Sequence, residues 1–208
     1  MIRELIKQLE REYPDAECAL HYTSPEQLLF ATILSAQCTD VQVNKVTPLL
    51  FKKYPCPKEL AKAKQKDVEN IIRSTGFFKN KAKNIIACSK ILVEKYKGKV
   101  PQSLEELVQL PGVGRKTANV VLGESFDIPG VVVDTHVKRL TNLIGLVDIE
   151  DPVKIEFALM EVVPKKYWSQ FSFWLILHGR KICIANRPKC FECVIQRYCE
   201  YGRKQLRM

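Results

Sequence analysis

Apolar residues along this chain recur mainly at the spacing of helix faces. In the first predicted helix they lie one turn apart, at Ile2, Leu5, Ile6 and Leu9. That helix ends before Pro14, and Ser24 with Pro25 then predicts an N-cap and a first helical residue. The apolar run at 26–36 suits a central helix, whereas 130–133 reads as extended. The pattern therefore predicts an all-α fold with at most trivial strand content.

Helical spacing continues through the rest of the sequence. The further helices predicted cover residues 40–50, 58–72, 80–96, 104–110, 114–124, 137–144, 157–163 and 168–178. Asp40 stands where it could cap the first of these, and Gly179 where it could end the last. Ser103 and Glu106 have the spacing of a capping box, in which each side chain bonds the other residue's amide.

Composition and charge narrow the class of protein. The 208 residues are 46% hydrophobic with a net charge of +10, which favours a globular protein with a polyanionic partner, either nucleic acid or an anionic membrane surface. No apolar run reaches the roughly 18 residues of a membrane span, so we expect none. The charged N-terminal sequence lacks the apolar stretch of a signal peptide, which predicts a cytoplasmic protein, associated with the nucleoid in a prokaryote.

The segment 110–118, LPGVGRKTA, joins two predicted helices through a glycine-rich turn. Gly112 and Gly114 allow positive φ and let successive amides face an anion at the start of the second helix. A tight helix–helix turn is the alternative, but Arg115 and Lys116 directly after it favour a nucleic acid phosphate. Lys116 lies where a helix dipole disfavours its charged form, so it is either a phosphate contact or an amine nucleophile able to form a Schiff base.

Asp134 follows the apolar run of 130–133 and precedes a predicted helix. An aspartate at this position is commonly an N-cap. A carboxylate at the edge of the core could also activate a nucleophile or stabilise a developing cation. The two roles are compatible, and the sequence leaves both open.

Four cysteines near the C-terminus have the spacing C-x6-C-x2-C-x5-C, at Cys183, Cys190, Cys193 and Cys199. Clustered cysteines in a protein that is not secreted indicate metal ligands before disulfides. Spacing alone does not separate zinc from an iron–sulfur cluster, since both accept four thiolates. Arg187 and Lys189 lie within this loop and could bind a DNA backbone.

These motifs occur in a characteristic order. They are LSAQCTD at 34–40, LPGVGRKTA at 110–118, VDTHV at 133–137, LHGR at 177–180 and the cysteine loop. The arrangement resembles the endonuclease III family of base-excision DNA repair enzymes over nearly the whole chain. Chance agreement of the hairpin lysine, the downstream aspartate and the cysteine spacing is negligible.

The resemblance implies a two-domain, all-α architecture with the active site in a cleft between the domains. Residues 18–128 would form a six-helix barrel containing the helix–hairpin–helix, at about 104–124. Residues 1–17 and 129–208 would form a discontinuous domain around a [4Fe–4S] cluster, held by the loop 183–199. The cluster would serve as a scaffold for that loop, and we expect a monomer.

The resemblance also implies the chemistry. The enzyme would flip a damaged, oxidised pyrimidine out of double-stranded DNA. Lys116 would attack C1′ and expel the base, and the Schiff base would permit β-elimination 3′ to the abasic site. Asp134 would assist the lysine and stabilise positive charge at the sugar. The lesion spectrum stays open, because thymine or uracil opposite guanine is an alternative to oxidised pyrimidines.

Further positions match family residues that fill the gap left by the flipped base. They are Gln37, His136 and an aromatic residue, Phe77 or Phe78, where the family often has leucine. Cys38 replaces an expected small residue. The residues expected to contact DNA are therefore Gln37, Phe77, Gly112, Gly114, Arg115, His136, Arg187 and Lys189.

Three other functions compete with this prediction. One is an adenine-type or mismatch glycosylase of the same superfamily without lyase activity, which generally lacks the hairpin lysine. The others are a non-catalytic helix–hairpin–helix module that only binds DNA, and a zinc-stabilised structural protein. The presence of Lys116 favours the lyase over the adenine-type glycosylase, whereas the metal content of the purified protein would separate zinc from an iron–sulfur cluster.

Overall fold

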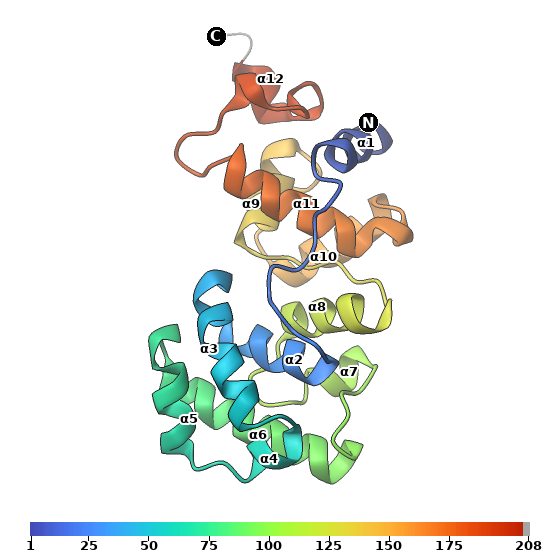
Figure 1. Ribbon diagram of the computed structural model, residues 1–208. Coiled ribbons are helices and arrows are strands. Elements are labelled where there is room, and N and C mark those ends of the chain that lie inside the picture. Colours follow the sequence, from blue (N-terminus) through green and yellow to red (C-terminus); the bar gives the residue numbers. More distant parts are fainter. Residues whose placement is uncertain (206–208) are drawn as a thin grey trace. The chain divides into compact units, whose positions relative to one another are not determined.

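The structure is a computed structural model, and it describes residues 1–205. All regular elements in that part of the chain are helices, as the sequence pattern predicts (Figure 1). None of these helices is long and apolar enough to cross a membrane. The chain divides into two compact units, residues 19–128 and residues 1–18 with 129–208.

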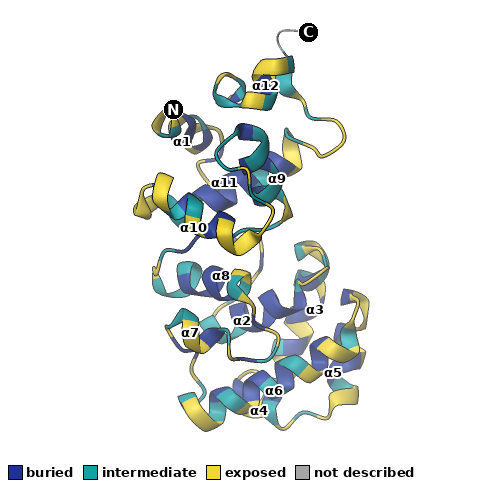
Figure 2. Cartoon of the chain, turned by 180° about the vertical axis from the view of Figure 1, so that it is seen from behind, coloured by how far each residue is buried: buried dark blue, intermediate teal, exposed yellow. Residues whose placement is uncertain are grey.

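The unit of residues 19–128 is built around one apolar helix, α2 (Pro25–Leu34). Seven of its residues are buried, and it packs against α3, α6 and α8 (Figure 2). Ser24 caps it through the amide of Gln27, and Pro25 is its first residue, as predicted. The other helices of this unit are α3 (Asp40–Lys53), α4 (Pro57–Ala61), α5 (Gln65–Ile72), η1 (Arg73–Thr75), α6 (Phe78–Tyr96), α7 (Leu104–Leu107) and α8 (Arg115–Phe126).

The second unit joins the two ends of the chain. Its helices are α1 (Ile2–Glu12), α9 (Thr135–Ile144), α10 (Pro152–Val162), η2 (Lys165–Tyr167), α11 (Trp168–Lys181), η3 (Cys190–Glu192), η4 (Gln196–Tyr198) and α12 (Glu200–Gln205). The apolar face of α1 packs on α11, where Trp174 is 2% exposed and its indole N–H donates to the Tyr13 carbonyl. Hydrophobic burial of this face holds α1 against α11, a helix that is distant in the sequence.

Several local predictions were wrong in detail. Thr39, not Asp40, caps α3, because its hydroxyl accepts the amide of Gln42. The helix predicted at 58–72 is two helices, and each packs separately on α6. At 103–106 the serine accepts the amide of Glu106, but its hydroxyl donates to the side chain of Glu105.

Gly179 does not end its helix. It lies buried inside α11, where an added Cβ would come within 2.7 Å of Nδ1 of His136 on α9. The glycine therefore permits a close approach of side chain to helix backbone, and this packing overrides its weak helix propensity.

Candidate functional site

The hairpin between α7 and α8 depends on Gly112. Its φ is +80°, and an added Cβ would lie 3.0 Å from Asn84 and 3.2 Å from Ile33. Both the backbone conformation and the available space therefore require glycine. The apolar residues on either side, Leu110 and Val113, are buried and anchor the turn.

Gly114 has a different role from the one predicted. Its φ is −96°, so positive φ is not what selects glycine here. It is the N-cap of α8, and with no side chain it cannot cap the first amides of that helix. Arg115 and Lys116 occupy the first two helical positions, no acid lies in the first turn, and the Lys116 side chain is exposed. An anion can therefore approach uncapped amides next to two cations.

Asp134 caps α9 in the structure. Its Oδ1 accepts the amides of His136 at 2.8 Å and Val137 at 2.9 Å. Within residues 1–205 no side chain or amide bonds Oδ2, so one carboxylate oxygen is available to another group. The preceding segment is held by a bond from the Val132 amide to the Ser172 hydroxyl at 2.9 Å. The cap predicted from the sequence is confirmed, and it engages only one of the two carboxylate oxygens.

Two residues predicted to fill the gap of a flipped base have unusual backbones. Gln37 has φ +51° and Phe77 has φ +46°, and both side chains are exposed. Phe77 is 67% exposed, whereas Phe78 starts α6 with its ring under Arg73 and is partly buried. A bulky residue in the left-handed region is strained and is commonly found at functional sites. The geometry thus distinguishes Phe77 from Phe78.

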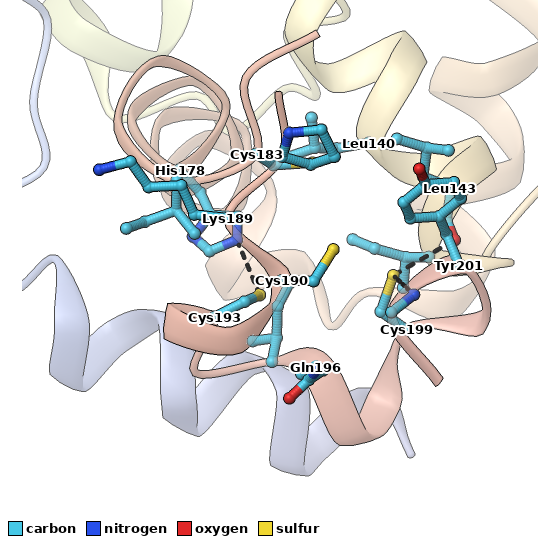
Figure 3. Close-up of a pocket in the computed structure, with 15 residues that line it drawn as sticks. Leu140, Leu143, His178, Cys183, Lys189, Cys190, Cys193, Gln196, Cys199 and Tyr201 are labelled. Atoms are coloured by element: carbon cyan, nitrogen blue, oxygen red, sulfur yellow. Dashed lines mark hydrogen bonds between the residues drawn. The ribbon is translucent and has the colours of Figure 1, made fainter. Parts of the chain in front are cut away.

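The four predicted cysteines come together. Cys183, Cys190, Cys193 and Cys199 line one pocket with mostly apolar residues of α9, α11 and the loop itself (Figure 3). Within residues 1–205, no three side chains of His, Cys, Asp or Glu lie close enough together to hold one metal ion. The four sulfur atoms therefore line one pocket without converging on the position of a single ion.

Hydrogen-bond donors surround these sulfur atoms. Arg139 Nη1 lies 3.5 Å from Cys183 Sγ, and the Gly202 amide donates to Cys199 Sγ at 3.3 Å. His178 Nε2 lies 3.3 Å from Cys193 Sγ (Figure 3). The Nδ1 atom of the same ring lies 2.9 Å from the Tyr13 hydroxyl. Such donors favour thiolates, which is what a thiolate-bound metal centre needs.

Burial acts against ionisation of the same thiols. It raises the pKa of Cys193 to about 12 and raises the pKa values of Cys190 and Cys199. Burial also lowers the pKa of His178 to about 4, so this imidazole is neutral at pH 7. Metal binding must therefore release protons from the cysteines.

Arg139 and His178 are the residues that sequence reasoning missed. Arg139 also donates from Nη2 to the Cys183 carbonyl at 2.6 Å, which ties α9 to the cysteine loop. Their signal was weak, because a single arginine or histidine in a helix reveals its partner only after folding. The loop cations lie outside: Arg187 is exposed, and Lys189 lies 3.7 Å from Glu192 in a half-exposed pair.

Comparison with known proteins decides the family. The model of the HhH-GPD superfamily base excision DNA repair protein matches residues 30–165. Endonuclease III of Synechocystis is 52% identical over 197 residues, which cover 94% of this chain and 90% of that protein. The chain belongs to the endonuclease III family. Family membership makes it a base-excision repair enzyme, a DNA glycosylase and AP lyase that binds DNA containing damaged bases.

Solved endonuclease III structures agree with this fold. A non-covalent endonuclease III–DNA complex matches with a TM-score of 0.93 at 41% identity, covering 100% of this chain and 97% of that chain. A trapped covalent endonuclease III–DNA intermediate matches with the same TM-score and identity over 99% of this chain and 97% of that chain. The predicted all-α, two-domain endonuclease III fold is confirmed.

Proposed function

We propose that this enzyme removes oxidised pyrimidines and cleaves the resulting site with Lys116 as nucleophile and Asp134 as its partner. The observation that carries the proposal is the exposed lysine in the first turn of α8, directly after an uncapped glycine terminus. An exposed amine beside an anion site can meet the sugar of a bound nucleotide. The trapped covalent intermediate of the related endonuclease III supports covalent chemistry.

The proposed reaction begins with a neutral Lys116 amine. Its lone pair forms a bond to C1′, the bond from C1′ to the base breaks, and the base leaves with that electron pair and takes up a proton. The bound amine then passes one proton to O4′ as the C1′–O4′ bond breaks, and the opened ring carries a protonated Schiff base at C1′. Removal of a C2′ proton then drives β-elimination, in which the C3′–O bond breaks and the 3′ phosphate departs.

Asp134 serves this reaction through its charge. With Oδ1 occupied by two amides, its carboxylate is fixed in one orientation and Oδ2 is available. A fixed carboxylate stabilises positive charge that develops at the sugar and can accept the amine proton. The proposal requires Oδ2 and the Lys116 amine to face the same nucleotide in the DNA complex.

The proposed DNA contacts divide by chemistry. Phosphate would meet the Gly112–Gly114 turn, Arg115 and the loop cations Arg187 and Lys189. Phe77 would enter the base stack as an apolar wedge. Gln37 and His136 would occupy the space left by the extruded base. The exposure and left-handed backbones of Phe77 and Gln37 support their part in this assignment.

The cysteine pocket is proposed to hold a [4Fe–4S] cluster. Four sulfur atoms lining one pocket, with N–H donors from Arg139 and Gly202, fit such a group. When bound, the cluster supplies a rigid covalent anchor for the loop 183–199. Arg187 and Lys189 on that loop are then held in place for the DNA backbone, while the base chemistry proceeds at Lys116.

The domain assignment belongs to the same proposal. Residues 18–128 are assigned as the barrel that carries the helix–hairpin–helix, and residues 1–17 with 129–208 as the cluster domain. The division into compact units at Cys18 and Pro129 supports these boundaries. The bacterial relatives support a cytoplasmic enzyme acting on nucleoid DNA.

Borohydride trapping on a duplex with one abasic site tests the nucleophile. We expect a covalent complex with the wild type and none with Lys116→Ala, since no other amine occupies this position. Lys90→Ala, which removes an exposed lysine on α6, is the matched control and should trap normally. Efficient trapping by Lys116→Ala would overturn the assignment. Duplexes with an oxidised pyrimidine, or with thymine or uracil opposite guanine, then identify the preferred lesion.

The cluster assignment has its own test. Protein purified without oxygen should contain iron and acid-labile sulfide in equal amounts and show broad visible absorption. Cys193→Ser should lose iron and DNA affinity before it loses Schiff-base chemistry in the folded fraction. A colourless protein that contains zinc would contradict the cluster.

A further inference from the structure

A buried lysine lies directly behind the proposed wedge. Lys81 is only 5% exposed, although it belongs to the first turn of α6 in a strongly basic segment. Its ammonium donates to the carbonyl of Thr75 at 2.8 Å. Lysine is rarely buried to this extent, so interactions within the site must compensate the ammonium group for its lost hydration.

The bond from Lys81 holds the chain just before Phe77. Thr75 ends η1, and its hydroxyl donates to the Ile72 carbonyl at 2.8 Å. Gly76 and Phe77 then both take positive φ, at 70° and 46°. Glycine adopts positive φ freely, but a phenylalanine in the left-handed region persists only where its surroundings fix it. Lys81 supplies such a restraint, because it binds the carbonyl of Thr75, the residue directly before Gly76 and Phe77.

The loop that carries Gln37 leads into α3, and α3 packs on η1, the element that Lys81 holds. Burial lowers the pKa of Lys81, and a charge on the nearby Cys38 thiol would act in the opposite direction. Cys38 directly follows Gln37, whose φ is +51°. A second link, from Gln42 Nε2 to the Ser74 hydroxyl at 2.6 Å, ties α3 to η1. The segment that Lys81 holds is thus joined to the helix that follows Gln37, and Phe77 and Gln37 are the exposed, left-handed residues of the two loops.

We propose that Lys81 is a positioning residue that fixes the Phe77 turn beside the Gln37 turn, so that both side chains enter a duplex together. Its ammonium has three donors in one compact head, which suits a site between two loops. Lys81 touches no DNA in this proposal and acts only through the two loops. The inference rests on the proposed glycosylase and lyase function.

The test compares two substrates that differ in their need for a wedge. A single-stranded abasic oligonucleotide has no stack to open, whereas an abasic site in a duplex does. We expect Lys81→Met to trap the single strand at the wild-type rate but the duplex about tenfold more slowly, since small misplacements reduce rates this strongly. Lys83→Met removes an exposed lysine two residues away and should behave as wild type.

A double-mutant cycle with Phe77→Ala shows whether Lys81 acts through the wedge. If it does, adding Lys81→Met to Phe77→Ala slows duplex trapping by less than about twofold, because coupled residues are not additive. Fully additive losses would overturn the proposal, as would an unchanged duplex rate in Lys81→Met. Equal losses on both substrates would show general damage and also overturn it.

Two further measurements keep the outcome clear. Should Lys81→Met fail to fold by circular dichroism, Lys81→Gln replaces it in the same cycle, because its shorter, uncharged side chain loses the reach of the ammonium to Thr75. Failure of the wild type to trap either substrate would instead contradict the proposed lyase. In that case, the affinity for a duplex with a tetrahydrofuran site, relative to intact duplex, still tests the positioning role. Lys81→Met should lower that ratio about tenfold.

Discussion

The N-termini of α8 and α9 differ in how their first backbone amides are capped. Each helix begins with amides that lack a partner within the helix. At α9, Asp134 satisfies two of them with its own carboxylate. At α8, Gly114 offers no side chain, and two cations follow where the helix dipole favours an anion. The protein itself caps the amides of α9, whereas the amides of α8 have no side-chain cap and are open to a ligand.

This difference shows which properties each site needs. A carboxylate that must hold one orientation gains from being a cap, since the cap bonds fix it. A terminus that must bind phosphate has to forgo its own cap, at a cost in helix stability. In the proposed function, stability and function therefore coincide at Asp134 and oppose each other around Lys116.

Replacing Asp134 should have the largest effect and separate its two roles. Asp134→Asn keeps an oxygen for the cap but removes the charge, so we expect turnover on damaged duplex to fall about 100-fold or more. The free energy of unfolding should change little, because asparagine also caps helices. Asp134→Ala should add a stability loss of about 1 kcal/mol. Single-turnover rates and denaturant unfolding measure the two effects.

The contrast between the two variants is the decisive observation. If Asp134→Asn proved fully active, the carboxylate would serve only as a cap. The α9 terminus would then contribute nothing to the chemistry.

Gly112→Ala should have the next largest effect, on the α8 side. The new methyl group meets Asn84 and Ile33 and forces an unfavourable backbone, which we expect to destabilise the protein by about 1–3 kcal/mol. The hairpin should shift, and duplex affinity should fall with it. Thermal unfolding and fluorescence anisotropy provide the measurements. Gly98→Ala is the control, because it has a similar φ of +80° but no neighbour within 4 Å.

Gly114→Asp converts the α8 terminus into a copy of the α9 terminus. The carboxylate should cap α8 and stabilise the protein by about 0.3 kcal/mol. The same carboxylate should occupy the anion site, so duplex affinity should fall about tenfold. The plot of log affinity against log salt concentration should also become less steep, by about 0.9 for each phosphate that the protein no longer neutralises. A variant that is more stable and binds as tightly as wild type would show that these amides do not meet phosphate.

The smallest effect expected is a gain of stability from removing the nucleophile. Lys116 lies near the positive end of α8, so Lys116→Gln should raise the free energy of unfolding by about 0.3–1 kcal/mol at low salt. The gain should shrink as salt is added, because exposed charges are screened. Unfolding at two ionic strengths checks this, and a loss of stability would mean that the lysine supports the fold.

The sequence was most informative where local rules decide the structure. The caps at Ser24 and Asp134 and the turn at Gly112 follow from side-chain chemistry that acts within a few residues. The four cysteines form one site because they are close in the chain. The family resemblance covered the motifs in order, and the comparisons confirm it.

Features that depend on distant contacts were not predictable in this way. Gly179 looked like a helix end, yet its neighbour is His136 on another helix. Arg139 and His178 bind the cysteine loop through contacts that no local pattern announces. No sequence pattern distinguishes Lys81 from the lysines near it, and only its burial in the structure does so.

The joining of the two chain ends in one unit has a consequence for synthesis. On the ribosome, α1 emerges first, but its partner α11 follows about 160 residues later, or roughly 10–30 s at usual elongation rates. During that time the apolar face of α1 has no surface to cover it, while residues 19–128 can already fold. The cysteine loop emerges after both. If this loop takes up the proposed cluster, that uptake is the last step of maturation, and the chain is most open to proteolysis before α11 covers α1.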